Sequence, residues 1–134
     1  MNILINIDVD DLEKGITFYQ NAFGLRLARR LFSGTVAELV GASTNIYLLT
    51  RPSGTSASPQ VAVPRDYQRH WTPVHLDFEV DDVPAAVQRA LAAGASLEGE
   101  IQKFAWGRLA MMSDPFGHGF CLLQFVGRGY DEVA

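Results

Sequence analysis

The sequence predicts an α+β fold in which two βαβββ modules, with their helices outside curved mixed sheets, follow one another along the chain. Residues 72–95 have the pattern of a strand, an acidic corner and a helix that ends at a glycine. Residues 2–24 show these features in the same order. Three strand-like segments separated by turn residues then follow each helix. A recurrence of this kind is typical of a duplicated unit, so we expect two copies of one module.

The first strand of the second module carries a notable group of polar side chains. Apolar and polar residues alternate over residues 74–80, as in a strand with one buried face. The polar face carries His75, Asp77 and Glu79. An Asp-Asp pair at residues 81–82 then predicts the N-cap of the following helix. We expect the chemistry of this protein on the polar face.

The first module shows the same alternation over residues 2–9, with Asn6 and Asp8 on the polar side. Asp10, with Glu13 three residues later, predicts a capping box at the start of the first helix. The repeat relates these polar residues to those of the second module, Asn6 to Asp77 and Asp8 to Glu79.

We expect one domain of 134 residues with module one at 1–51, a linker at 52–71, module two at 72–126 and a polar, frayed tail at 127–134. The strands expected after the two helices are residues 25–32, 35–40, 45–51, 96–105, 108–113 and 119–126. The linker is rich in Pro, Ser, Gly and Ala. A connection of this length is either a lid over a binding site or a solvated crossover, and the sequence leaves both interpretations open.

The amino-acid composition disfavours several classes of binding partner and indicates where the protein is located. The net charge of −4 disfavours nucleic acid and anionic membranes, which are bound through clustered Lys and Arg. The single cysteine, Cys121, cannot form an internal disulfide, so we expect a cytoplasmic protein. No apolar run approaches the roughly 20 residues of a membrane span. Because the chain begins with a strand-like segment, we also expect no secretory signal.

Several short motifs occur in an order that belongs to a known family. They are the corner VDDL at residues 9–12 leading to FY at 18–19 and FGL at 23–25, the corner VDD at 80–82, and WGR at 106–108 leading to DPFG at 114–117. With these motifs the chain resembles the vicinal oxygen chelate superfamily, which includes glyoxalase I, bleomycin resistance proteins and extradiol dioxygenases. The resemblance implies that the two modules curl into half-cups around one cup-shaped cavity. It also implies a homodimer.

The resemblance implies four positions for metal ligands, one on each of four strands, where metal-dependent members usually have His, Glu, His or Gln, and Glu. Carried over to this chain, the positions are occupied by Leu4, Leu48, His75 and Cys121. The two leucines have no donor atom, whereas a catalytic zinc site typically uses three protein ligands. We therefore expect no metal and no other cofactor of the usual kind. A divalent metal would require an atypical ligand set that includes His75.

The catalytic candidates are His75, Glu79 and Asp8, because an imidazole beside carboxylates can move a proton on a bound carbonyl compound. The alternative is that Asp8 and Glu79 lie solvated at the rim. The candidates for ligand contact are Asn6, Leu48, Trp71, Asp77, Trp106, Arg108 and Cys121. Among them, Arg108 could hold a carboxylate or phosphate, and the aromatic residues suit the mostly apolar wall of a small-molecule pocket.

We predict a small-molecule-binding protein of the glyoxalase and bleomycin-resistance type. It would hold a mostly apolar or aromatic ligand in the cup and act by sequestration. The sequence does not decide whether the protein is an enzyme. One alternative is a glyoxalase-type lyase or isomerase, or a dioxygenase-related enzyme, that uses His75 with Asp8 or Glu79 on an atypical metal or by acid–base catalysis. Another is a degenerate dioxygenase-like domain that binds a partner.

Overall fold

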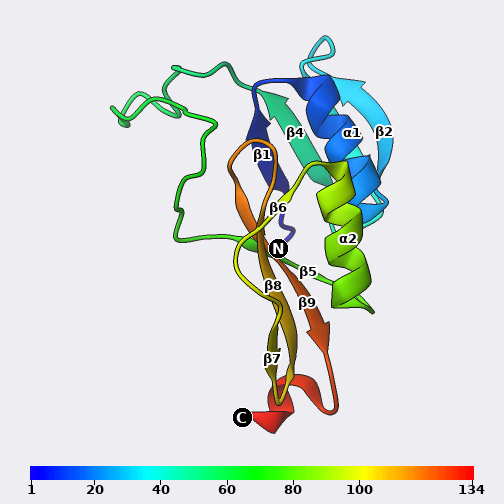
Figure 1. Ribbon diagram of the computed structural model, residues 1–134. Coiled ribbons are helices and arrows are strands. Elements are labelled where there is room, and N and C mark those ends of the chain that lie inside the picture. Colours follow the sequence, from blue (N-terminus) through cyan, green and yellow to red (C-terminus); the bar gives the residue numbers. More distant parts are fainter. The chain divides into compact units, whose positions relative to one another are not determined.

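The computed structural model describes residues 1–134, which form two compact units, Met1–Gln68 and Arg69–Ala134. Each unit contains one α-helix and one mixed β-sheet (Figure 1). Neither helix has the length and apolar character needed to cross a lipid bilayer. The units are described separately below.

The first unit has a four-stranded sheet with the strand order β1-β4-β3-β2. Strand β1 runs parallel to β4, and the other neighbouring strands are antiparallel. The elements of this unit are β1 (Ile5–Val9), α1 (Leu12–Phe23), β2 (Arg26–Leu31), β3 (Val36–Val40) and β4 (Ile46–Thr50).

The second unit repeats this arrangement in the strand order β5-β9-β8-β6, with β7 also paired to β8. Strand β5 runs parallel to β9, as β1 does to β4. The elements are β5 (Leu76–Glu79), α2 (Val83–Ala93), β6 (Ser96–Leu97), β7 (Gln102–Phe104), β8 (Gly107–Ser113), β9 (Gly119–Phe125) and the short 3₁₀ helix η1 (Gly129–Glu132). The predicted α+β fold with two βαβββ modules is therefore confirmed.

Both helices begin and end at residues whose chemistry accounts for the boundary. The side chain of Asp82 accepts a hydrogen bond from the amide of Ala85 at 3.0 Å, which satisfies a free donor of the first turn of α2. In the first unit this role belongs to Asp11 and not to Asp10, so the predicted capping box is wrong by one residue. Gly24 and Gly94 end the helices in the left-handed conformation, as glycine allows.

Three strand predictions differ from the structure. The strand predicted at residues 74–80 is the shorter β5, Leu76–Glu79, so His75 lies one residue before it. The segment predicted as one strand at residues 96–105 is divided into β6 and β7, because Gly99 has a φ of 83° that interrupts an extended strand. The first strand begins at Ile5 rather than at residue 2. The tail, expected to fray, forms η1, where the Arg128 and Glu132 side chains are ion-paired.

Each helix covers one face of its own sheet. In the first unit Ile16 and Tyr19 of α1 are buried, and in the second unit Val83, Val87 and Ala90 of α2 are buried. Burial of an aliphatic or aromatic side chain of this size contributes roughly 1.5–3 kcal/mol. The opposite face of each sheet is therefore the one on which polar and ligand-binding side chains can be displayed.

Candidate functional site

A row of side chains crosses the face of the second sheet that α2 leaves uncovered. The register pairs Asp77 of β5 with Cys121 of β9, and Cys121 with Met111 of β8. Side chains of paired residues point to the same face of a sheet, with Cβ atoms roughly 4.5–5.5 Å apart. A carboxylate, a thiol and a thioether are therefore neighbours.

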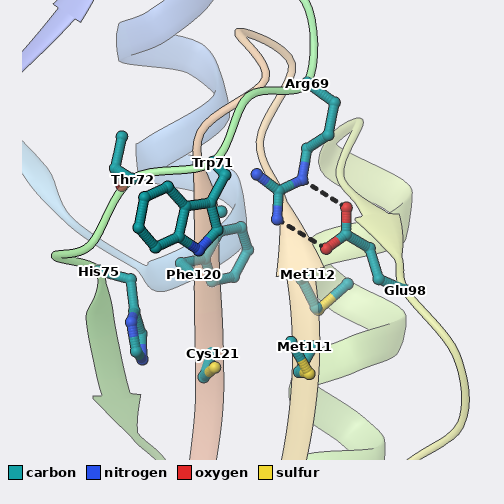
Figure 2. A pocket seen from close by; sticks show the side chains of 10 residues that line it. Arg69, Trp71, Thr72, His75, Glu98, Met111, Met112, Phe120 and Cys121 are labelled. Carbon is teal, nitrogen blue, oxygen red and sulfur yellow. Dashed lines mark hydrogen bonds and ion pairs between the residues drawn. The ribbon is translucent and has the colours of Figure 1, made fainter.

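A pocket of about 210 Å³ opens beside this row. In Figure 2 the side chains of Cys121 and Met111 project from neighbouring strands, and the indole of Trp71 lies on the segment that leads into β5. The pocket is lined by Arg69, Trp71, Thr72, His75, Glu98, Met111, Met112, Gly119, Phe120 and Cys121. Most of these side chains are apolar or sulfur-containing, which is typical of a small-molecule site.

His75, Asp77 and Cys121 form a cluster at the pocket. One ligand atom from each side chain lies within 4.8 Å of the others, and His75 Nε2 is 3.1 Å from Asp77 Oδ1. Burial raises the pKa of the Cys121 thiol to about 11, and the charge of Asp77 and its hydrogen bond with the thiol act in the same direction. The carboxylate therefore favours the protonated thiol, the reverse of what a cysteine nucleophile requires.

The residues that precede β5 cross the mouth of the pocket, and we call residues 69–72 the pocket strap. Arg69 fixes the strap through two contacts with Glu98, from Nε to Oε2 at 2.6 Å and from Nη2 to Oε1 at 2.9 Å (Figure 2). The guanidinium lies against Gly119, where an added Cβ would be 2.7 Å from Nη2. Arg69 lowers the pKa of the Glu98 carboxyl, chiefly through this hydrogen bonding.

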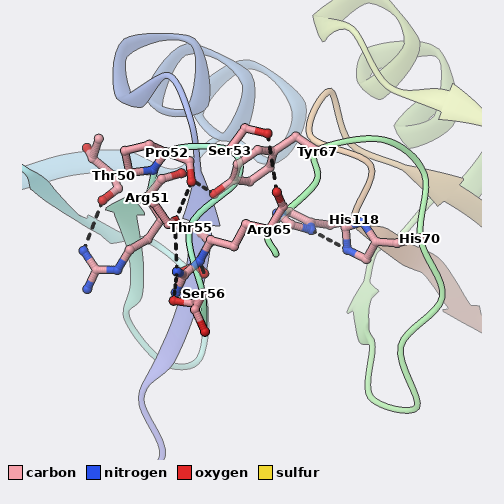
Figure 3. A network of polar contacts seen from close by, with 11 residues as sticks. Thr50, Arg51, Pro52, Ser53, Thr55, Ser56, Arg65, Tyr67, His70 and His118 are labelled. Carbon is pink, nitrogen blue, oxygen red and sulfur yellow. Dashed lines mark hydrogen bonds and ion pairs between the residues drawn. The ribbon is translucent and has the colours of Figure 1, made fainter. Parts of the chain in front are cut away.

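A second contact holds the strap at His70. Its Nε2 lies 3.0 Å from Nδ1 of His118, and its amide donates to the carbonyl oxygen of Gly117 at 3.3 Å (Figure 3). His118 is itself placed by the turn at Asp114, whose Oδ1 accepts hydrogen bonds from the amides of Phe116 and His118. The predicted Asp-Pro-x-Gly turn thus fixes one imidazole of the pair.

In the first unit, Asp8 is engaged by the segment that the sequence predicts as a linker. Arg65 Nε donates to Asp8 Oδ2 at 2.7 Å, and the Arg65 side chain is only 15% exposed. The same guanidinium donates to the hydroxyl of Thr55 and the carbonyl oxygen of Ser56 (Figure 3). Tyr67 adds a hydrogen bond from its hydroxyl to the carbonyl oxygen of Arg51. Asp8 therefore has a structural partner, and the segment is anchored to β1 rather than solvated throughout.

The structure corrects the position assigned to Leu48. This residue is 0% exposed and packs against α1, where its Cδ1 would be 3.2 Å from a Cβ added to Gly15. A ligand contact is incompatible with this placement. The register pairs Asn6 with Tyr47, just as it pairs Asp77 with Cys121, so Tyr47 is the residue that corresponds to Cys121.

The remaining predicted ligand contacts lie apart from the pocket in the second unit. Arg108 shares its face of β8 with Ala110 and Met112, the side opposite Met111. Trp106, in the turn before β8, is stacked on Phe104 with their ring centroids 4.9 Å apart. Neither Trp106 nor Arg108 lines the pocket.

Two predicted polar residues, Glu79 and Asn6, do not line the pocket. Glu79 lies two residues beyond Asp77 on the same face of β5 and is exposed. Asn6 lies on β1 of the first unit, in register with Tyr47. Of the predicted residues, the structure brings His75, Trp71 and Cys121 to one pocket, with Asp77 in contact with His75.

Sequence reasoning missed several lining residues. Met111 and Phe120 are large apolar residues, which the sequence alone assigns to the core. The structure shows that Met111 is 47% exposed and is paired with Cys121. Arg69 and Glu98 are 29 positions apart and carry no motif. The remaining unpredicted lining residues are Thr72, Met112 and Gly119.

The four metal-ligand positions implied by the resemblance can be tested against these donors. Leu4 has no donor atom, and the β4 position corresponding to Cys121 holds the phenol of Tyr47 instead of a carboxylate. The usual set of histidines and glutamates therefore does not fit. What the structure offers instead is the cluster of His75, Asp77 and Cys121.

Comparison with known proteins agrees with the fold and the repeat. A family model described as a glyoxalase-like domain matches residues 4–123. An uncharacterised protein of Mycobacterium bovis is 34% identical to this chain over 131 residues, which cover 93% of this chain and 84% of the relative.

Two solved structures extend the comparison. A glyoxalase/bleomycin resistance protein/dioxygenase family enzyme from Burkholderia phytofirmans PsJN superposes with a TM-score of 0.72 at 20% identity, over 92% of this chain and 97% of the other. TnmS3, an antibiotic-binding protein from Streptomyces sp. CB03234, superposes with a TM-score of 0.63 at 28% identity, over 92% and 93% of the two chains. The superfamily predicted from the sequence motifs is confirmed.

Proposed function

The chain belongs to the glyoxalase-like domain family, and from this membership we propose that it binds a mostly apolar or aromatic small molecule and acts by sequestration. The ligand is held in the pocket of the second unit. No metal of the usual kind takes part, because Leu4 has no donor atom and Tyr47 and Cys121 stand where the usual set has carboxylates. The observation that carries the proposal is the exposed indole of Trp71 beside a wall of apolar and sulfur-containing side chains.

The Trp71 side chain supports the binding of a planar ring. It is 82% exposed, so a flat ligand stacked on it would remove apolar surface from water. Met111 lies across the pocket, where a thioether makes favourable contacts with aromatic rings. The volume of about 210 Å³ is below the usual 300–1,000 Å³, which suits one ring system or one end of a larger ligand.

The charges around the pocket favour a cation. Arg69 pairs with Glu98, whereas Asp77, beside the pocket, contacts the His75 imidazole and no arginine. The carboxylate of Asp77 is therefore available to balance a positive charge on the ligand. The antibiotic-binding relative TnmS3 adds support for small-molecule binding at 28% identity.

Fluorescence of Trp71 tests the proposal with three planar probes: a phenanthridinium cation, a neutral anthraquinone and a naphthalenesulfonate anion. Trp106→Phe leaves Trp71 as the only tryptophan in the protein. We expect saturable quenching, strongest for the cation, that Asp77→Asn weakens. A free probe concentration of about one hundred times its Kd would also raise the free energy of unfolding by about 2.7 kcal/mol. Equal, non-saturable quenching by all three probes would contradict the proposal.

A second candidate function is proton transfer on a bound carbonyl compound, with Glu79 as the accompanying acid. The specific observation in its favour is the 3.1 Å contact that lets Asp77 orient the His75 imidazole. The Asp8 carboxylate fits this role less well, because Arg65 is paired with it. Solvent deuterium exchange into dihydroxyacetone, followed by NMR, tests the idea. Exchange above the buffer rate that His75→Gln abolishes would favour the enzyme.

We also propose that the protein is a cytoplasmic homodimer. Support comes from the large exposed apolar side chains of the neighbouring residues Ile3 and Leu4 in the first unit, since exposed apolar surface commonly marks an interface. The free thiol of Cys121 fits a reducing compartment. Light scattering after size exclusion tests the oligomeric state, and a monomer mass across the micromolar range would contradict it.

A further inference from the structure

Soft donor atoms meet at the pocket of the second unit. Cys121 is the only cysteine of the chain and is 7% exposed. Its cross-strand partner Met111 is 47% exposed and lines the same pocket. The ligand atoms of His75, Asp77 and Cys121 lie within 4.8 Å of one another. A thiol, a thioether and an imidazole are thus presented together (Figure 2).

This donor set differs in chemical character from sets rich in carboxylates. Oxygen ligands suit hard divalent ions such as Mg²⁺ and Ca²⁺, whereas soft thiolate and thioether ligands favour Cu(I), zinc and iron–sulfur clusters. From this arrangement we propose that His75, Cys121 and Met111 bind one Cu(I) ion. Asp77 holds the imidazole, as carboxylates commonly do beside metal-bound histidines.

The geometry needs only a small adjustment. Bonds of the lengths found at zinc sites, roughly 2.0 Å to nitrogen and 2.3 Å to sulfur, place a nitrogen and a sulfur donor of one ion no more than about 4.3 Å apart and two sulfur donors no more than about 4.6 Å apart. The side chain of His75 is 54% exposed and can rotate to close the remaining gap. Met111 has three rotatable bonds, so its sulfur can reach the same point. Binding exchanges the thiol proton for copper: the S–H bond breaks, an S–Cu bond forms, and the proton passes to solvent.

The choice of Cu(I) over Zn(II) rests on Met111. Zinc takes Cys, His and carboxylate ligands but makes no use of a thioether. Trp71 and Phe120 line the same pocket, and an apolar surround restricts access of water to the ion. The copper site shares Met111 and the pocket with the proposed organic ligand, so copper binding is measured without that ligand and organic-ligand binding is measured with a chelator present.

Anaerobic competition with the colorimetric chelator bicinchoninate measures Cu(I) binding on the full chain, without any organic ligand. We expect one ion per chain and a near-ultraviolet thiolate-to-copper absorption, which only Cys121 can produce. Cys121→Ser and Cys121→Ala should both abolish the absorption. His75→Gln should weaken binding at least about tenfold. Met111→Leu should weaken Cu(I) binding while leaving Zn(II) affinity unchanged.

His118→Gln is the matched control, because His70 and His118 are the other two histidines of the chain and place their ring nitrogens 3.0 Å apart. It should leave Cu(I) affinity unchanged. Loss of binding in His118→Gln but not in His75→Gln would overturn the proposal. So would a wild-type protein that does not compete with bicinchoninate, or one that binds Zn(II) more tightly and ignores Met111→Leu. Circular dichroism and thermal unfolding confirm that each variant is folded.

Discussion

Arg69 and Glu98 form an ion pair with two contacts, 2.6 Å between Nε and Oε2 and 2.9 Å between Nη2 and Oε1. The pair joins the start of the pocket strap to the residue that follows β6. Because Trp71 lies two residues after Arg69, the position of its indole depends on this contact. The strap is therefore held at the pocket by charge as well as by the His70–His118 contact.

Acid should release the strap. Arg69 places the folded-state pKa of Glu98 below the reference value of 4.5. The stabilisation is therefore present above pH 4.5 and is lost as the pH falls through the lower folded-state pKa. Both side chains are partly exposed, so the loss is only about 0–1 kcal/mol. We expect Trp71 emission in Trp106→Phe to change in this acid range. The same transition in a protein that also carries Glu98→Gln would contradict the assignment.

Cys121 should react slowly with iodoacetamide at neutral pH. A pKa of about 11, against a reference of 9.0, leaves about a hundredfold less thiolate below pH 9 than an unperturbed thiol would have. The alkylation rate should rise until about pH 11. Asp77→Asn should lower this pKa and accelerate the reaction, because both the charge and the hydrogen bond of Asp77 raise it. Glu79→Gln, on the same strand, serves as the comparison, and equal acceleration by both variants would refute the specific role of Asp77.

Asp8→Asn should loosen the segment at residues 52–67. It removes the charged acceptor of Arg65, and a hydrogen bond to a charged group contributes about 1.5–3 kcal/mol. We expect a loss of stability in this range on urea unfolding, together with faster tryptic cleavage after Arg65. The exposed residue Asp10 provides the control, since Asp10→Asn should change neither. Unchanged cleavage in Asp8→Asn would show that the remaining contacts suffice to hold the segment.

Paired substitutions on β4 should distinguish its two faces. Leu48→Ala removes a fully buried side chain beneath α1 and should cost about 2–5 kcal/mol. Tyr47→Ala, on the uncovered face, should cost about 1 kcal/mol. Chemical denaturation of both variants provides the comparison. A larger loss for Tyr47→Ala would reverse the register given for this strand.

Local patterns in the sequence predict the fold well, because caps and strand alternation are determined within a few residues. The Asp-Asp corners and the terminal Gly24 and Gly94 define both helices, and the turn at residues 114–117 sets the last hairpin. The errors are shifts of one or a few residues in the boundaries of elements. Asp11 caps α1 in place of Asp10. The two aspartates are adjacent in the sequence, and the residue pattern alone does not decide which carboxylate accepts the hydrogen bond from the first turn.

The sequence predicts the site at residues on or just before β5 and at Cys121 of β9, which the family resemblance indicates. His75 and Asp77 follow from alternation along that strand, and Trp71 lies close before it. The cross-strand neighbour Met111 requires a known register, because a shift of one residue exchanges the two faces of a strand. The same sensitivity separates Leu48 from its neighbour Tyr47, which lies on the other face of β4.

The matching registers of the two sheets place corresponding side chains in different surroundings. The row Asn6, Tyr47, Glu38 in the first unit corresponds to Asp77, Cys121, Met111 in the second. In the first row Glu38 is buried and bonded to Arg29 and Asn45, whereas in the second the corresponding thioether is open to a pocket. One repeated register thus presents two different surfaces. The row of the first unit is closed by the ion pair of Glu38 with Arg29, whereas single substitutions on three neighbouring strands would change the lining of the pocket in the second.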